Sequence, residues 1–406
     1  MINWQKVKLG EIVKLQQGFA LNKKSNHYLS QEKNGIPLLR ISDLLNDTQS
    51  LFVKTNIPKQ FIANENDIIY SRTGQVGHAF INKKGVVYNN CFKVIVDEKT
   101  DKNFLYFFLN TPDIRAVVKS LATGTAQPDL NHDAFKSVKI NLPPLLTQQK
   151  IAKILSNYDD LIENNLKRIK LLEESARLTF EEWFLRYRIK GKKLNIDQTS
   201  GLPFNWKKIK IKNYVATISK GPSLNYNLGT SKGVEVLNQS CIRNGEIELE
   251  KVLIARELKD NKKSAYLKVN DILINSMGQG TLGRVSKNVS VDKKMIIHNC
   301  ITFLRAKDKY SQFMLFYFIS LHQKYFEIVA HGSTGQSTLK KDLISSLMIT
   351  LPDDKTLKSF DLIVASIWNE IGILKKQNQL LKEAQNILLP RLMVGLIVTD
   401  NMNIAI

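Results

Sequence analysis

The stretch TQQKIAKILSNYDDLIENNLKRIKLLEESARLTFEEWFLRY, residues 147–187, decides the fold. It contains no glycine or proline, and its apolar residues recur every three or four positions, which lines one face of a helix. Pro143 and Pro144 block a helix just upstream, Thr147 can cap the first turn, and Gly191 suits a helix stop. A helix of this length measures about 60 Å, more than the width of a small domain, so it is expected to need a long helical partner.

The partner is a second stretch with the same spacing, DDKTLKSFDLIVASIWNEIGILKKQNQLLKEAQNILLPRLMVG, which begins at Asp353. Residues 171–175 of the first stretch align with residues 380–384 of the second, at an offset of 209. Two unrelated amphipathic helices, each on its own domain, are the alternative. The wider repeat argues against that alternative.

The similarity extends across the whole chain, which indicates a tandem duplication. The offset between the two copies drifts only from 198 to 209. The matched segments are WQKVKL at Trp4 with WKKIKI at Trp206, GIPLLRIS at Gly35 with GVEVLNQS at Gly233, NDIIYSRTGQ at Asn66 with NDILINSMGQ at Asn270, Asn90-Cys91 with Asn299-Cys300, GTAQPDL at Gly124 with STGQSTL at Ser333, and Leu142-Pro143 with Leu351-Pro352.

Each half is expected to be a mixed α/β domain followed by one long helix. The fold class is α+β: two tandem domains separated by two long antiparallel coiled-coil helices, with a pseudo-two-fold internal repeat. The expected parts are 1–146 for the first domain, 147–190 for the first helix, 191–353 for a linker and the second domain, and 354–406 for the second helix. Within the domains we expect strands at 36–41, 67–70, 86–88, 92–96 and 138–141, single helices at 102–121 and 311–330, and a linker at 188–205.

The composition indicates a globular protein with a polyanionic partner. The chain has 406 residues, which exceeds one core, and a net charge of +22, which favours nucleic acid or an anionic surface. No apolar run is long enough to span a membrane, and the start MINWQKVKLGEIVK lacks a signal-peptide core. The three cysteines, Cys91, Cys241 and Cys300, are far apart in sequence, which suits a reducing cytoplasm.

Motifs for chemistry are missing from the sequence. The six histidines form no HxH or HExxH pair, so we expect no metal site. There is no GxxxxGK[ST] phosphate loop and no GxSxG elbow. We therefore expect no catalytic residue and no cofactor bound by this chain.

Two basic domains on paired helices suit double-stranded DNA, with each domain reading one half of a bipartite site. The scaffold positions agree between the halves, whereas polar loop positions differ: Arg40 aligns with Asn238, and Arg72 with Ser276. Such divergence is what two readers of different half-sites would show, because Arg suits guanine edges and Asn or Gln suits adenine edges. Neutral surface drift is the alternative for any single residue.

Four segments resemble the specificity subunit of type I restriction–modification systems. They are WQKVKLGEI at residues 4–12, ISDL at 41–44, NDIIYSRTGQVG at 66–77 and LPPLLTQQKIAKILSNYDDLIE at 142–163. The last is close to the family's LPPLxEQxxIxxxLxxxDxxI junction. The second copy departs from it, because Leu351-Pro352-Asp353-Asp354 lacks the second proline and the glutamine, and Trp368 stands where Asp159 does.

The resemblance implies two target-recognition domains, two helical spacers and no catalysis by this chain. Two methyltransferase subunits would dock on it and methylate adenine with S-adenosylmethionine, and two restriction subunits, which use ATP and Mg, can join them. Methyltransferase contacts are expected on the outer faces of the helices, at Gln148, Asp159 and Glu163. The expected DNA-contacting residues are Lys23, Lys24, Tyr28, Arg40, Ser42, Arg72, Thr73, Gln75, Thr125 and Gln127 in the first half, and Tyr226, Asn227, Asn238, Ser240, Asn275, Ser276, Gln279, Thr334 and Gln336 in the second.

Two other functions stay open at this point. One is a self-contained nuclease or methyltransferase fragment, which the lack of an NPPY-type or FxGxG-type motif disfavours. The other is a coiled-coil adaptor that binds polyanions without sequence preference.

Overall fold

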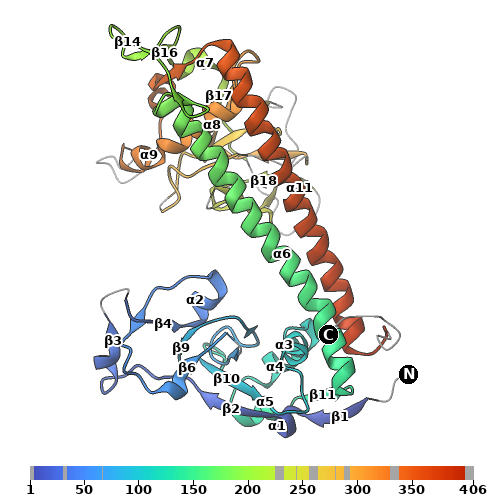
Figure 1. Cartoon of the computed structure of the whole chain (residues 1–406). Helices are drawn as coiled ribbons and strands as arrows, with labels where there is room; N and C mark the ends of the chain where they lie inside the picture. Colours follow the sequence, from blue (N-terminus) through green and yellow to red (C-terminus); the bar gives the residue numbers. More distant parts are fainter. Residues whose placement is uncertain are drawn as a thin grey trace. The chain divides into compact units, whose positions relative to one another are not determined.

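The computed structural model describes residues 4–30, 34–65, 67–224, 233–243, 245–255, 264–278, 280–287, 293–329 and 338–397 (Figure 1). The chain forms two compact units, one of Met1–Asn164 with Asn378–Ile406 and one of Asn165–Gln377. The division falls within the two long helices, so each unit contains a segment of both. The domain limits expected at residues 146, 190 and 353 separate the globular parts from the long helices, whereas the two compact units each combine both. These limits stay predictions.

The first unit is built on a four-stranded antiparallel sheet and a five-stranded mixed sheet. The four-stranded order is β2 (Val13–Gln17), β10 (Cys91–Val96), β7 (Ile68–Ser71) and β8 (Ala79–Phe80), and the five-stranded order is β3 (Leu29–Ser30), β5 (Phe52–Val53), β4 (Ile36–Leu39), β9 (Gly85–Val87) and β6 (Ile62–Ala63). β1 (Gln5–Lys8) pairs with β11 (Lys139–Leu142). The helices are α1 (Leu9–Ile12), α2 (Ile41–Asn46), α3 (Lys102–Leu109), α4 (Pro112–Leu121) and α5 (His132–Ser137).

The second unit repeats this topology. Its four-stranded sheet has the order β17 (Val215–Lys220), β25 (Ile301–Ala306), β22 (Ile272–Asn275) and β23 (Val285–Lys287), and β16 (Lys207–Lys210) pairs with β26 (Met348–Leu351). A three-stranded sheet contains β21 (Leu253–Ala255), β18 (Val234–Leu237) and β24 (Met295–Ile297), and β19 (Ile242–Arg243) pairs with β20 (Glu246–Ile247). Its helices are α7 (Ile211–Tyr214), α8 (Gln312–Leu321), α9 (Gln323–Val329) and α10 (Lys341–Ser346). The parallel pair β4–β9 of the first unit has its counterpart in β18–β24.

The strand registers confirm the duplication and correct one alignment. Ser71 pairs with Cys91 in the first unit, and its counterpart Asn275 pairs with Ile301 in the second. Cys91 therefore corresponds to Ile301, and Asn90 corresponds to Cys300. The sequence match of Asn90-Cys91 with Asn299-Cys300 is wrong by one residue.

Two further expectations need correction. The single helix expected at 102–121 is two helices, because Asn110 ends α3 and Pro112 occupies the first turn of α4, where the missing N–H is harmless. The matching segment is likewise divided into α8 and α9. The linker expected at 188–205 forms two short hairpins, β12–β13 (Arg188–Ile189 with Lys192–Lys193) and β14–β15 (Ile196–Asp197 with Leu202–Pro203).

The two long helices are α6 (Leu145–Phe180), which continues as a π-helical turn at Glu181–Leu185, and α11 (Asp354–Met393). They run antiparallel within each unit. In the first unit Gln385 donates to Asp159 Oδ1 at 2.7 Å, and in the second Arg168 donates to Glu370 Oε1 at 2.7 Å. The expected antiparallel helix pair is confirmed. Within the described ranges, neither of these helices nor any other is apolar enough over a sufficient length to cross a membrane.

Each unit has its own apolar core. In the first unit Leu392 and Met393 of α11 pack in the same cluster as Ile151 and Leu155 of α6. In the second unit the core contains a cluster of aromatic side chains, which come from both long helices and from the start of the second globular part. Its rings are those of Phe180, Trp183, Phe184, Trp206 and Phe360, with Phe184 and Phe360 centroids 4.8 Å apart. Aromatic pairs of this kind add to the energy of area burial.

A lysine side chain is buried in the described part of the second unit. Lys287 at the end of β23 is 3% exposed, and its ammonium lies 4.3 Å from the ring centroid of Phe313 and 4.6 Å from that of Trp368. Its Nζ donates to Asn270 Oδ1 at 2.7 Å. Burial, with a smaller effect of the Lys375 charge, lowers the pKa of Lys287 to about 7. The ring faces favour the ammonium and oppose this effect.

The stability of the second unit should therefore depend on pH through Lys287. The unfolded chain has the ordinary lysine pKa, so it binds more protons than the folded chain between about pH 7 and about pH 10, and stability rises with pH in that window. Relative to Lys287→Met, the unaltered chain should gain about 2 kcal/mol between about pH 7.5 and about pH 9, at about 1.4 kcal/mol per pH unit. Urea unfolding at both pH values measures the difference, and equal slopes for the two proteins would contradict it.

Candidate nucleic-acid interface

Two polar loops of the first unit, both expected to read DNA, lie together at the end of β7. Asp129 joins them: its carboxylate accepts from Arg72 Nη2 at 2.6 Å and from Thr73 Oγ1 at 2.5 Å, and its backbone pairs with Thr123. Gly74 N donates to Pro128 O at 2.8 Å. The loops 71–77 and 123–129 therefore form one continuous surface.

Of the expected contacts on this surface, Gln75, Thr125 and Gln127 are exposed, whereas Arg72 and Thr73 are half-buried. Gly124 has a φ of 94°, and a Cβ there would lie 2.9 Å from Gln127 O, so the turn requires glycine.

Arg72 and Asp129 form the charged centre of this surface. Burial alone would raise the pKa of Asp129, but hydrogen bonds from Arg72 and Thr73 outweigh it and hold that pKa below its usual value. Arg72 Nη1 also donates to Gln17 Oε1 at 3.0 Å, while its Nε is buried with no partner among the described residues. The guanidinium is thus fixed in orientation by side chains distant in sequence.

The other expected contacts in the first unit are placed as follows. Arg40 Nε pairs with Asp43 Oδ2 at 2.9 Å, and Ser42 next to it is exposed. Burial would raise the pKa of Asp43, but hydrogen bonds from Ser50, Arg40 and Thr48 hold it low. Lys23 and Lys24 are exposed on a turn. The ring of Tyr28 is half-buried and lies 5.7 Å from that of Phe19.

The second unit differs at the matching positions. Asn275 and Ser276 are fully buried at 0% exposure, and Asn238 is 6% exposed. Asn275 Nδ2 donates to the carbonyl groups of Gln239 and Thr281, and Ser276 Oγ lies 2.5 Å from Thr302 Oγ1. These two side chains secure the loop from inside, so the expectation that they lie on a reading surface is wrong.

Asn238 caps a short turn, since its Oδ1 accepts from Ser240 N at 2.8 Å and from Ser240 Oγ at 2.6 Å. Ser240 itself is exposed. The remaining expected contacts of this half lie outside the described residues. They are Tyr226, Asn227, Gln279, Thr334 and Gln336.

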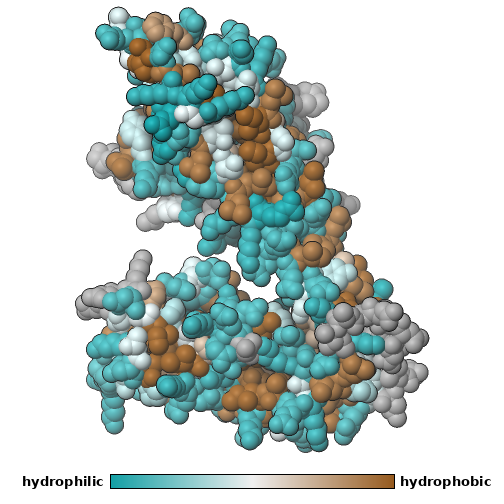
Figure 2. Space-filling view, viewed as in Figure 1, coloured by the Kyte–Doolittle hydropathy of each residue, from teal (hydrophilic) through white to brown (hydrophobic). Residues whose placement is uncertain are grey.

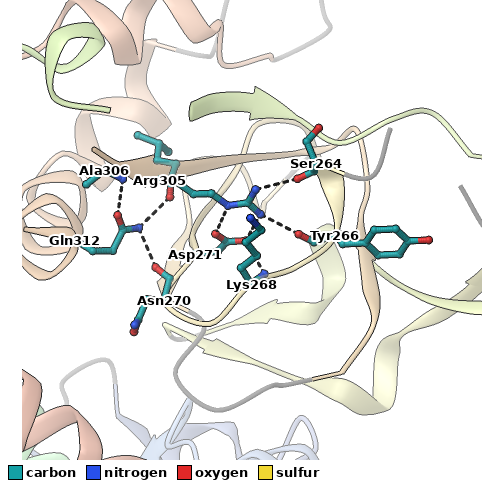
Figure 3. Close-up of polar contacts among 9 residues, drawn as sticks. Ser264, Tyr266, Lys268, Asn270, Asp271, Arg305, Ala306 and Gln312 are labelled. Carbon is teal, nitrogen blue, oxygen red and sulfur yellow. Dashed lines mark hydrogen bonds and ion pairs between the residues drawn. The ribbon is translucent and has the colours of Figure 1, made fainter. Parts of the chain in front are cut away.

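An ion pair anchors the second globular part (Figure 3). Arg305 on β25 binds both carboxylate oxygens of Asp271, with Nε–Oδ1 of 2.6 Å and Nη2–Oδ2 of 2.7 Å. Asp271 is 1% exposed and also accepts from Lys268 N at 2.8 Å. Arg305 donates further to the carbonyl groups of Ser264 and Tyr266, so one guanidinium ties the segment before β22 to β25.

The expected partner contacts on α6 are placed differently from the prediction. Gln148 is 1% exposed, accepts from Asp101 N at 2.8 Å and donates to Pro143 O at 2.9 Å, so its place on an outer face is wrong. It connects the start of the helix to the globular part. Asp159 is half-buried, and burial raises its pKa despite the hydrogen bond from Gln385. Glu163 is exposed as expected.

The sequence reading missed two rows of exposed apolar side chains on the long helices. Leu171, Leu178 and Leu185 recur every seven residues in the second unit, and their exposed fractions are 70%, 40% and 49%. Leu380 and Ile387 of α11 and Val394, which follows directly after the helix, have the same spacing in the first unit, and their exposed fractions are 51%, 53% and 58%. Each member of one row aligns with a member of the other at the offset of 209.

Within an α-helix a spacing of seven keeps side chains on one face, which holds for Leu171 with Leu178 and for Leu380 with Ile387. Figure 2 shows hydrophobic side chains among hydrophilic ones over the long helices. The sequence contains this spacing, as apolar residues that stand next to the positions of the buried helix face.

Comparison with known proteins places these features in a family. A family model described as "Type I restriction modification DNA specificity domain" matches residues 1–174 and again residues 203–383. The MjaVIII specificity subunit of Methanocaldococcus jannaschii is 28% identical over 412 residues, covering 99% of this chain and 94% of that protein. The Escherichia coli EcoBI specificity subunit is 22% identical over 312 residues, covering 71% and 64%.

The fold has a solved counterpart as well. The S subunit of a type I restriction–modification system from M. genitalium matches with a TM-score of 0.59 at 15% identity, covering 96% of each chain. The resemblance seen in the sequence and the expected fold class are confirmed. With the family model matched once in each half, this chain belongs to the type I restriction–modification DNA specificity family.

Proposed function

We propose that this chain is the non-catalytic subunit that reads DNA for a type I restriction–modification enzyme. Each unit would read one half of a bipartite site in double-stranded DNA, through the polar loops at the end of its central sheet. The observation that carries the proposal is the family match in both halves, together with the strand registers that the two units share. A shared scaffold with different side chains suits two different half-sites.

The two exposed apolar rows support docking of two partner subunits. An exposed row of apolar side chains at a spacing of seven suits a partner helix, because a partner that covers these side chains removes them from water and so stabilises the complex. Since the rows repeat at the offset of 209, one in each unit, two copies of the same partner would find equivalent surfaces. We assign these surfaces to methyltransferase subunits, which would supply the chemistry with S-adenosylmethionine in the cytoplasm. Two restriction subunits that use ATP and Mg can complete the enzyme.

Methylation mapping tests this function. The chain is expressed with the methyltransferase subunit of its own operon in a methylation-free host, and modified adenines are read genome-wide. The expected result is a split motif that is missing when the methyltransferase is expressed alone. Replacing residues 1–146 by those of a relative should change one half of the motif and leave the other half intact.

The polyanion adaptor remains the competing function, since a net charge of +22 favours any polyanion. Competition with unrelated DNA separates the two. A specific reader should keep at least about 1,000-fold preference for its motif at physiological salt, whereas an adaptor should show none. Absence of any motif from a folded, associated complex would disprove the DNA-reading function.

A further inference from the structure

A pair of side chains beside the polar loops of the first unit has a hydrogen-bond pattern that leaves one acceptor available. Gln17 at the end of β2 and His132 at the start of α5 are half-buried, and His132 Nε2 lies 3.1 Å from Gln17 Oε1. Neither residue was among those expected to contact DNA. They lie next to Arg72, which itself contacts Gln17.

The orientation of the Gln17 amide is fixed on both sides. Its Oε1 accepts from Arg72 Nη1, which is only a donor, and its Nε2 donates to Asn89 O at 2.8 Å, which is only an acceptor. A flipped amide would lose both hydrogen bonds. The atom of Gln17 that faces His132 is therefore the acceptor Oε1.

This fixes the tautomer of His132. Because Gln17 Oε1 only accepts, His132 Nε2 must carry the proton and donate it. Burial, followed by the charges of Arg72 and Lys136, lowers the pKa of His132, which keeps the ring neutral at neutral pH. Nδ1 is then an acceptor, and it has no hydrogen-bond partner among the residues that the structure describes. An edge-to-face contact with Phe92, with the ring centroids 5.2 Å apart, orients the His132 ring further.

The matching positions of the second unit carry side chains that donate hydrogen bonds, whereas the His132 ring offers an acceptor. Gln17 pairs with Phe92 in the first unit and Lys220 pairs with Thr302 in the second, so Lys220 stands where Gln17 does. Leu9 N donates to Val138 O, and Ile211 N donates to Leu347 O, which aligns α5 with α10 and His132 with Lys341.

Lys220 and Lys341 also lie near each other. Burial and then the charge of Lys341 lower the pKa of Lys220. Lys341 is exposed at the start of α10. Both positions offer only donors, whereas the His132 ring offers an acceptor.

We propose that His132 and Lys341 occupy matching base-reading positions of the two half-sites, with opposite preference. His132 Nδ1 accepts a hydrogen bond from the exocyclic amino group of adenine or cytosine. The Lys341 ammonium donates to the acceptors of guanine or thymine. Gln17 and Arg72 act as positioning residues, since they fix the tautomer and ring of His132. This inference rests on the proposed function.

The test exchanges the two side chains in the full chain, co-expressed with its methyltransferase subunit. His132→Lys should alter the preferred base at one position of the half-site read by the first unit, with a change in discrimination of about 10- to 100-fold. Lys341→His should do the same in the other half-site only. Asn157→Lys is the control, because it places the same charge at an exposed residue of the same unit, on α6 and outside the polar loops. It should leave both half-sites unchanged.

The outcomes are distinct. If both exchanged chains associate with the methyltransferase and methylate the unaltered motif, the inference is wrong and the proposed function stands. If the unaltered chain produces no motif, both are wrong. Should His132→Lys fail to copurify with the methyltransferase, the Lys341→His arm decides alone, because Lys341 is exposed and its replacement tests the matching position of the other half-site.

Discussion

Replacing Asp271 with alanine is expected to destabilise the second unit by about 3–5 kcal/mol. The substitution leaves the Arg305 guanidinium, whose side chain is 16% exposed, without its carboxylate. It also removes the acceptor for Lys268 N. A buried charge that loses its partner costs far more than an exposed one, because protein replaces the water that would otherwise solvate it.

Tryptophan fluorescence during urea unfolding measures the effect on the second unit. Three of the four tryptophans, Trp183, Trp206 and Trp368, lie in the core of that unit, and Trp4 lies in the first. Glu370→Ala is the control, because Glu370 pairs with Arg168 in the same unit with its side chain 45% exposed, and its loss should cost at most about 1 kcal/mol. The double change Asp271→Ala with Arg305→Met should recover part of the stability. Equal losses for Asp271→Ala and Glu370→Ala would show that the buried ion pair contributes no more to stability than the exposed one.

Placing aspartate at both Leu171 and Leu178 is expected to weaken binding of one methyltransferase subunit by at least about 100-fold. Covering an exposed leucine contributes about 1.5–3 kcal/mol, and an unpaired carboxylate in the covered interface adds a desolvation cost. Both leucines are exposed in the free chain, so the substitutions should leave its own stability nearly unchanged. Copurification and mass measurement of the complex report the number of bound subunits.

The internal repeat provides the matched comparison for this prediction. Aspartate at Leu380 and Ile387 should remove the other subunit, and all four substitutions together should remove both. Lys170→Asp changes an exposed residue on a neighbouring face of α6 and should alter affinity by no more than about twofold. A complex that keeps two subunits after all four substitutions would show that the apolar rows are not the docking surfaces.

Much of the fold could be predicted from the sequence because it depends on short-range signals. Apolar spacing defines both long helices, and the repeated segments define the two globular parts. The errors arose where one residue overrides a pattern. Pro112 divides a continuous apolar stretch into α3 and α4. Gln148 lies three residues before buried Ile151, so helical spacing places it on the buried face despite its polarity.

The candidate site was less predictable because its contacts join residues distant in sequence. Arg72 and Asp129 are separated by 57 positions, and Gln17 and His132 by 115. Loop position alone suggested Arg72 as a free reader, whereas the structure pairs it with two side chains. Asn275 and Ser276 occupy the matching loop but point inward, since hydrogen bonds to Gln239 and Thr302 hold them. Periodicity carries no information on such pairings.

The first unit combines residues 4–164 with residues 378–397, and this has a consequence for synthesis on the ribosome. Leu392 and Met393 belong to the same buried cluster as Val7 and Ile151, whereas the second unit is complete once Gln377 has emerged. Translation proceeds from the N-terminus at about 5–20 residues per second, so the unit that starts first must wait for the last helix. Until then Ile151 and Leu155 keep an uncovered apolar face. A nascent chain that stops before the end of α11 can therefore complete the second unit, whereas the first unit stays incomplete and exposed to chaperones and proteases.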